Sequence, residues 1–130
     1  MALSREDLVR QANAAFGRGD LGVLRSQYLA EEVVWHVPGR GPLAGDYQGI
    51  AEVMALFSKI SELSAGTAHF KLHDVVANDN HTVSLATITA ERAGKQYQDN
   101  LVQVMHVQDG KATEVWTHAA DQFAAQEFWS

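Results

Sequence analysis

The second half of the chain constrains the fold most, because residues 67–119 repeat one pattern four times. In each repeat apolar and polar residues alternate, as they do in a strand with one buried face. Short turn-forming runs separate the repeats, and such connections join antiparallel strands into hairpins. The separators are Asn78-Asp79-Asn80, Ala93-Gly94 and Asp109-Gly110. The pattern predicts an antiparallel meander of four strands at 67–78, 81–93, 95–107 and 111–119.

The first half of the chain reads instead as helices around one strand. Ser4 and Asp7 fit a capping box, and Pro38 ends the strand because proline cannot donate to a ladder. The predicted elements are a helix from Ser4, a short helix from Asp20, a strand over 32–37, a helix over 50–63 and a terminal helix or tail over 121–129.

Together these elements predict an α+β fold with helices gathered on one face of an antiparallel sheet. We expect a cone-shaped, curved, mainly antiparallel sheet with the N-terminal helices packed across it. Such an arrangement encloses a pocket, and pockets of this kind bind small molecules. With 130 residues, the chain is expected to form a single domain over 1–130.

Net charge and composition exclude several classes of binding partner and site. A net charge of -6 argues against nucleic acid and anionic membrane surfaces, where a basic face supplies the affinity. The chain has no cysteine, which excludes thiol nucleophiles and thiolate metal sites.

No apolar run approaches the roughly 20 residues of a membrane helix, and no signal peptide is visible, so we expect a cytoplasmic protein. His69 and His73 share a strand face with Lys71 between them and lack a third ligand, so no metal site is predicted.

Several motifs resemble a known family. They are FGRGD (16–20), VVWHVPGRGPLAGDYQG (33–49), VQDGK (107–111), EVW (114–116) and Asp121 ahead of a terminal FW. With these motifs the chain resembles the SnoaL-like family of the nuclear-transport-factor-2-like superfamily, which includes ketosteroid isomerases, limonene epoxide hydrolases and polyketide cyclases. The resemblance implies a cone of bent sheet, an apolar pocket and homodimers that form through the sheet. One fold hosts many reactions, so the resemblance leaves the chemistry open.

The catalytic residues of that family carry over only in part. The base of the ketosteroid isomerases is an aspartate before a proline, and Val37 stands there instead. Their oxyanion-binding aspartate corresponds to Gln103, whose amide can also donate a hydrogen bond. In SnoaL-like cyclases an acid/base aspartate follows a tryptophan after the final strand, and Trp116 and Asp121 match that pair.

Asp121 and His118 are the candidates for catalysis. A carboxylate desolvated at the pocket mouth would have a raised pKa suited to proton transfer, and a nearby histidine could act as acid or base. The alternative for Asp121 is a cap on the terminal helix. The alternative for His118 is a histidine at a strand end in solvent.

Five further residues are candidates for ligand binding: Trp35, His36, Tyr47, Gln103 and Trp116. Alternation along a strand allows one of Trp35 and His36 to face the pocket, and the apolar residues on either side favour Trp35, unless the proline break twists the strand locally. Gln103 is a polar group on an apolar face, which either bonds a ligand or is satisfied internally. Tyr47 closes the pocket or packs against the following helix, and Trp116 lines the wall.

The sequence therefore predicts a cofactor-independent enzyme of isomerase, cyclase or hydrolase type that uses acid/base catalysis on a small apolar carbonyl compound. The alternative is a non-catalytic domain of the same fold that binds a small molecule or dimerises. In either case the expected partners are a small hydrophobic molecule and a second copy of the chain.

Overall fold

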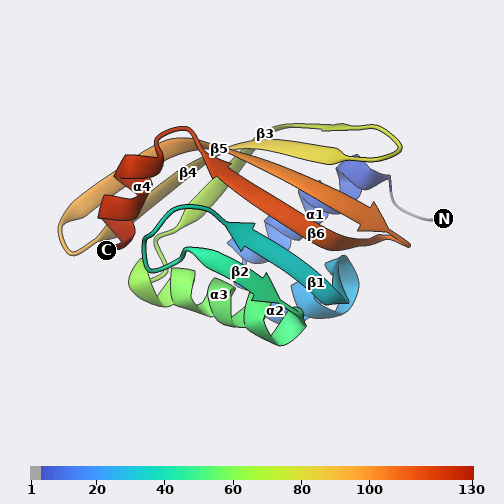
Figure 1. Cartoon of the computed structure of the whole chain (residues 1–130), viewed down its shortest axis with the longest axis horizontal. Helices are drawn as coiled ribbons and strands as arrows, with labels where there is room; N and C mark the ends of the chain where they lie inside the picture. The colour runs from blue at the N-terminus through green and yellow to red at the C-terminus, as the bar shows by residue number, and fades with distance from the viewer. Residues whose placement is uncertain (1–3) are drawn as a thin grey trace.

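The structure is a computed structural model that describes residues 4–130. Four α-helices, one π-helical turn and six strands follow one another along the chain (Figure 1). In order they are α1 (Arg5–Gly17), α2 (Leu21–Val23), the π-helical turn η1 (Leu24–Tyr28), β1 (Leu29–Val37), β2 (Gly45–Gln48), α3 (Ile50–Leu63), β3 (His69–Ala77), β4 (Thr82–Arg92), β5 (Lys95–Gln108), β6 (Lys111–Ala119) and α4 (Gln122–Trp129).

The six strands form one sheet in the order β2-β1-β6-β5-β4-β3. The four predicted C-terminal strands are confirmed as an antiparallel meander, and the β1–β6 pair is parallel. Figure 1 shows α1 and α3 on the same side of this curved sheet, with α4 at the end where the chain leaves β6. The predicted α+β fold, with helices across a mainly antiparallel sheet, is confirmed.

The helix boundaries follow the local sequence. The Ser4 side chain accepts a hydrogen bond from the Asp7 backbone N–H at 3.1 Å, so the predicted first cap is present. The Asp20 side chain accepts from the Val23 N–H at 3.3 Å and starts α2. α3 follows Gly49, whose φ of 87° lies in a region that glycine adopts without strain. No helix within residues 4–130 is long and apolar enough to cross a membrane.

Besides shifts of one or two residues at other strand ends, the first strand starts earlier than predicted and one strand was not predicted. β1 begins at Leu29, three residues earlier than expected, because η1 ends at Tyr28 and the strand follows it without a loop. The glycine-rich run after Pro38 also contains a strand, β2, which pairs with β1 from Val34–Gln48 to Val37–Gly45. Glycine is depleted in strands, so this short edge strand carried no sequence signal.

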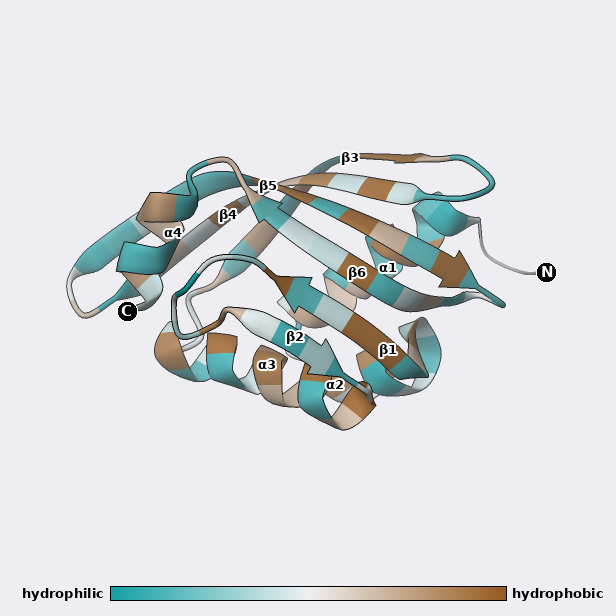
Figure 2. Cartoon of the chain, in the orientation of Figure 1, coloured by the Kyte–Doolittle hydropathy of each residue, from teal (hydrophilic) through white to brown (hydrophobic). Residues whose placement is uncertain are grey.

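The core lies between the helices and the concave face of the sheet. Figure 2 shows apolar and polar bands alternating along the strands, which is the pattern of a sheet with two different faces. Val33, Val53, Leu56 and Val115 are at most 1% exposed and mark the centre of this layer. The helices described between residues 4 and 130 leave the opposite, convex face of the sheet uncovered.

Candidate functional site

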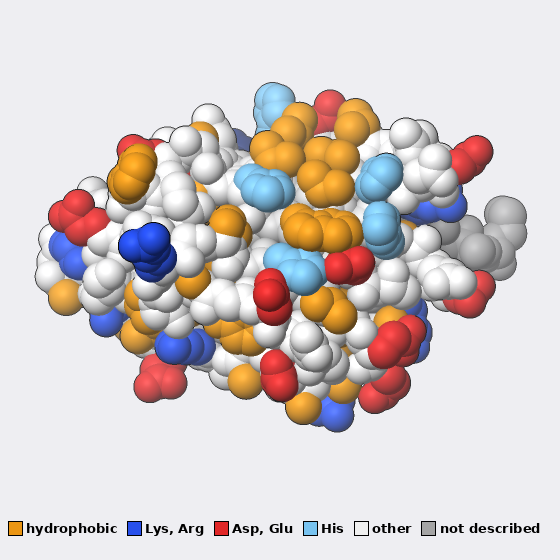
Figure 3. Space-filling model, in the orientation of Figure 1, with side chains coloured by type: hydrophobic (Ala, Val, Ile, Leu, Met, Phe, Trp, Pro, Cys, Tyr) orange, Lys and Arg blue, Asp and Glu red, His pale blue; other side chains and the backbone are white. Residues whose placement is uncertain are grey.

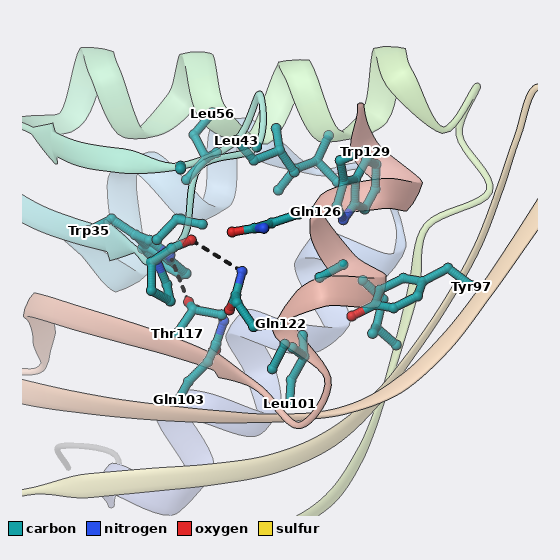
Figure 4. Close-up of a pocket in the computed structure, with 18 of the residues that line it drawn as sticks. Trp35, Leu43, Leu56, Tyr97, Leu101, Gln103, Thr117, Gln122, Gln126 and Trp129 are labelled. Atoms are coloured by element: carbon teal, nitrogen blue, oxygen red, sulfur yellow. Dashed lines mark hydrogen bonds between the residues drawn. The ribbon is translucent and has the colours of Figure 1, made fainter.

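A cavity of about 100 Å³ lies between the concave face of the sheet, α3 and α4 (Figure 4). We call it the α4 cavity. Most of its wall is apolar, and its polar groups are four uncharged side chains and one phenol. The apolar lining is Trp35, Val37, Pro38, Leu43, Ala44, Leu56, Phe57, Ile60, Phe70, Ile88, Leu101, Ala119, Ala125 and Trp129. The polar lining is Gln103, Thr117, Gln122, Gln126 and Tyr97.

Thr117 is the centre of a small hydrogen-bonded group on the sheet side of the cavity. Its Oγ1 accepts from Trp35 Nε1 at 3.1 Å and from Gln103 Nε2 at 3.4 Å. These two bonds occupy the lone pairs of the hydroxyl oxygen, and the hydroxyl proton has no acceptor within residues 4–130. The group therefore leaves one O–H and the Gln103 carbonyl oxygen free to bond a polar atom in the cavity.

The loop after Pro38 forms the rim of the cavity by docking onto α4. Gln122 Nε2 donates to the Pro38 carbonyl at 3.3 Å, and the Arg40 N–H donates to Gln126 Oε1 at 2.8 Å. Gly39 has a φ of 95°, and a Cβ there would lie 2.6 Å from Gln122 Nε2. The glycine thus allows the loop to approach the helix closely enough for both hydrogen bonds.

Tyr97 connects the cavity to a pair of acidic residues. Its hydroxyl donates to Asp99 Oδ2 at 2.8 Å, and the Asp121 backbone N–H donates to the same oxygen at 3.0 Å. Burial, followed by the hydrogen bond to Asp99 and the nearby carboxylates, raises the pKa of Tyr97 well above its usual range. The phenol therefore keeps its proton and directs it at Asp99.

Of the two expectations for Asp121, the structure shows the helix cap and not the carboxylate at the pocket mouth. Its Oδ1 accepts from the Ala124 N–H at 3.0 Å, so the side chain caps α4, and Asp121 is exposed outside the cavity lining. The first N–H groups of a helix need acceptors, and Asp121 supplies one. The Asp121 backbone N–H still donates to Asp99, so Asp121 is linked to Tyr97 through the Asp99 carboxylate.

His118 lies in solvent near the end of β6, which is the alternative that the sequence left open, and Trp116 lies elsewhere than expected. Thr117 faces the cavity, so its neighbours on β6 point to the convex face. His118 is exposed there, and the Trp116 ring stacks on His36 at a centroid distance of 5.3 Å. His118 and Asp121 are not brought together, and Trp116 does not line the α4 cavity.

Among the other predicted residues, Trp35 and Gln103 line the α4 cavity. Strand alternation predicted that Trp35 faces the pocket and that His36 lies on the opposite face of the sheet. The structure shows Trp35 in the cavity wall and His36 outside it. Tyr47 is not part of the cavity wall; its hydroxyl donates to the Leu43 carbonyl at 2.8 Å and holds the rim loop. Burial raises the pKa of Tyr47.

Four polar residues of the cavity were not predicted: Tyr97, Thr117, Gln122 and Gln126. Thr117 alternates with Val115 and Ala119 on β6, so the parity argument used for β1 would have found it. Gln122 and Gln126 are four residues apart, which places them on one face of the terminal helix. Tyr97 alternates with Leu101 and Gln103 on β5, so the same parity argument would have placed it on this face.

On the convex face, His36 is held between two carboxylates. Its Nδ1 lies 2.6 Å from Asp46 Oδ1 and its Nε2 lies 2.7 Å from Glu114 Oε2. His106 Nδ1 lies 3.8 Å from the other oxygen of Glu114. Figure 3 shows histidine and acidic side chains beside an exposed apolar patch on the face in view. The hydrogen bonds to Asp46 and Glu114 raise the pKa of His36 above its ordinary value of 6.5, against the lowering effect of burial.

This arrangement predicts a pH dependence of stability. Because the folded state holds the proton of His36 more tightly, its contribution is fully present below pH 6.5 and is lost as the pH rises through the raised folded-state pKa. We expect thermal unfolding between pH 5.5 and 8.5 to show this loss in the wild type and a flatter profile in His36→Asn. His118→Asn, an exposed change on the same face, should keep the wild-type slope. Equal slopes in wild type and His36→Asn would contradict the prediction.

Comparison with known proteins gives a consistent set of matches. The SnoaL-like domain model matches residues 9–115. The uncharacterised protein Rv0034 of Mycobacterium tuberculosis is 35% identical over 125 residues, which are 95% of each chain. The structure of Bal32a, from a soil-derived mobile gene cassette, has a TM-score of 0.91 at 31% identity, covering 95% of both chains. TerC, co-crystallised with polyporic acid, has a TM-score of 0.82 at 20% identity, covering 94% of this chain and 95% of TerC, and shares the fold.

Proposed function

The chain belongs to the SnoaL-like domain family, and we propose that it binds a small, uncharged, mostly apolar molecule in the α4 cavity. The observation that carries this proposal is the chemistry of the cavity wall. An apolar lining surrounds one group, Thr117 with Gln103, that has a free donor and a free acceptor. A carbonyl or hydroxyl oxygen of the ligand would bond there, and its apolar part would pack against the aromatic wall.

The lack of charge in the wall defines which ligands are disfavoured. No Asp, Glu, His, Lys or Arg lines the α4 cavity within the part of the chain that the structure describes. Burying a carboxylate or an ammonium without a partner costs several kcal/mol. A ketone should therefore bind, whereas a carboxylate of the same shape should not.

Direct binding of two matched probes tests this function. Cyclohexanone should raise the melting temperature and saturate in calorimetric titration, whereas cyclohexanecarboxylate should do neither. Ala119→Leu, which places a larger side chain in the cavity, should weaken cyclohexanone binding about tenfold or more, equivalent to about 1.4 kcal/mol. Val102→Leu adds volume on the convex face and should leave the affinity unchanged. Equal binding of the ketone by wild type and Ala119→Leu would reject this site.

The second candidate function is acid/base catalysis of isomerase, cyclase or hydrolase type without a cofactor. It is supported by the Tyr97–Asp99 pair, because Tyr97 lines the cavity and Asp99 accepts its proton. A proton leaving the ligand would pass to Tyr97 Oη while the phenolic proton passes to Asp99 Oδ2. Asp121 would assist through its backbone N–H, which helps to hold the Asp99 carboxylate.

Turnover separates the two functions. Small ketones, epoxides and lactones are first screened for binding. Those that bind are then incubated with wild type and with Tyr97→Phe, and product formation is measured. Loss of the proton path should lower kcat about 100-fold or more while binding remains. Turnover that is unchanged in Tyr97→Phe would reject the pair as the catalytic group. Binding without turnover in the wild type would leave the chain as a binding domain.

We further propose that the convex face of the sheet is the surface of a homodimer in the cytoplasm. Figure 3 shows an exposed apolar patch among histidine side chains, and this patch supports the assignment, since large exposed apolar patches mark interaction sites.

A further inference from the structure

A second cavity, of about 110 Å³, lies deeper in the molecule between α1, η1 and the sheet. We call it the α1 cavity. It adjoins the α4 cavity, because six residues line both: Trp35, Phe57, Ile60, Phe70, Leu101 and Gln103. The rings of Trp35 and Phe57 meet edge to face at a centroid distance of 5.1 Å in this common wall. The side chains of these shared residues form the boundary between the two spaces.

A row of polar side chains runs across the sheet through the junction of the two cavities. Ser84 on β4 pairs with Gln103 on β5, which pairs with Thr117 on β6. Ser84 lines the α1 cavity, Thr117 lines the α4 cavity and Gln103 lines both. The side chains around this row are mostly apolar, and polar groups in such surroundings are costly unless they bond something.

Ser84 is the member of this row that lies at the wall of the α1 cavity. It is 3% exposed, and it lines that cavity together with apolar side chains. A hydroxyl in an apolar wall favours a ligand that bonds to it. Together with Thr117, Ser84 places a hydroxyl on each side of Gln103.

The volumes of the cavities also favour a ligand that occupies both of them. Each is small compared with the roughly 300–1,000 Å³ of pockets that hold drug-sized ligands. A molecule larger than one ring would need both spaces, and rotation of Trp35 and Phe57 would join them.

We propose that the two cavities are lobes of one site, occupied by an elongated, uncharged molecule with an oxygen function near its middle. The central carbonyl or hydroxyl bonds the row of Ser84, Gln103 and Thr117, and one apolar arm extends into each lobe. This inference rests on the proposed binding function and names the shape of its ligand.

The test uses 5-nonanone, a symmetric ketone with two equal arms, and one filling variant for each lobe. Ala86 lines only the α1 cavity and Ala119 only the α4 cavity. Ala86→Leu and Ala119→Leu should each weaken 5-nonanone binding at least tenfold, measured by calorimetry, whereas cyclohexanone should lose affinity only in Ala119→Leu. Ala12→Leu also fills the α1 cavity, from the side of α1. It replaces Ala86→Leu in this test if Ala86→Leu folds poorly.

The position of the oxygen is tested with the isomer 2-nonanone. Wild type should bind 5-nonanone about tenfold more tightly than 2-nonanone, and Gln103→Leu should remove this preference. If Ala86→Leu and Ala12→Leu both leave 5-nonanone binding unchanged while Ala119→Leu abolishes it, the ligand occupies one lobe and the inference is wrong, although the proposed function stands. If neither 5-nonanone nor cyclohexanone binds wild type, both are wrong.

Discussion

Replacing Trp35 with alanine should lower the free energy of unfolding by about 3 kcal/mol, at the lower end of the range for removing a core aromatic because the ring is only partly buried. The ring packs edge to face on Phe57, and its Nε1 donates to Thr117. Removing it deletes part of the wall between the two cavities and leaves Thr117 with one donor fewer. Urea unfolding measures the loss.

Two further variants separate packing from hydrogen bonding at this position. Trp35→Phe keeps a ring against Phe57 but loses the Nε1 bond, so it should lose about 1 kcal/mol. Phe123→Ala removes an aromatic side chain from a residue that is 83% exposed and should change stability by less than about 0.5 kcal/mol. A Trp35→Ala loss no larger than that of Phe123→Ala would mean that Trp35 is not part of the core wall.

The same variant tests the relation between the cavities. Removal of the ring opens part of the wall that the α1 and α4 cavities share, so 5-nonanone should stabilise Trp35→Ala by more degrees than it stabilises wild type. Cyclohexanone, which one cavity can hold, should show a smaller difference between the two proteins.

The parts of the fold that the sequence predicted are those set by local periodicity. The meander over residues 67–119 follows from alternation and short turns, and α3 from apolar residues at helical spacing. Parity along β1 placed Trp35 on the concave face and His36 on the convex one, because successive strand residues point to opposite faces. The family resemblance was then confirmed by the domain match over 9–115.

The parts that the sequence did not predict depend on contacts between distant segments. Trp35 meets Thr117 across 82 residues because β1 pairs in parallel with β6, and local patterns do not indicate that pairing. Asp121 was compatible with both a cap and a catalytic group, and the start of α4 at Gln122 decided for the cap. The ion pairs of His36 needed β2 beside β1, and β2 was hidden in a run of glycines.

The convex face contains the feature on which the dimer proposal depends, a row that crosses the whole sheet. Cross-strand pairing links one residue from each strand in the order Asp46, His36, Trp116, Val104, Val83 and Val76. The last four are apolar, and Val76 is 52% exposed. Since the helices cover only the other face, a second copy of the sheet would bury this row against its own equivalent, as a two-fold interface requires.

Val104→Asp should therefore convert a dimer into a monomer. The substitution sets a carboxylate in the middle of the apolar row, and in a two-fold dimer it would face the apolar surface or the same charge of the partner. Leaving a charge buried without a partner costs about 3–5 kcal/mol, so the dissociation constant should rise at least 100-fold. Sedimentation velocity across a concentration series measures this change.

The control for this variant adds the same charge away from the row. Thr89→Asp introduces a carboxylate at an exposed position near the far end of β4 and should leave the dimer intact. Cyclohexanone binding, which depends on the concave face, should persist in both variants and would show that Val104→Asp is folded. A wild-type chain that stays monomeric at 100 µM, or a Val104→Asp variant that dimerises like wild type, would place the partner surface elsewhere. The apolar row would then need another occupant, because an exposed patch of this kind tends to associate.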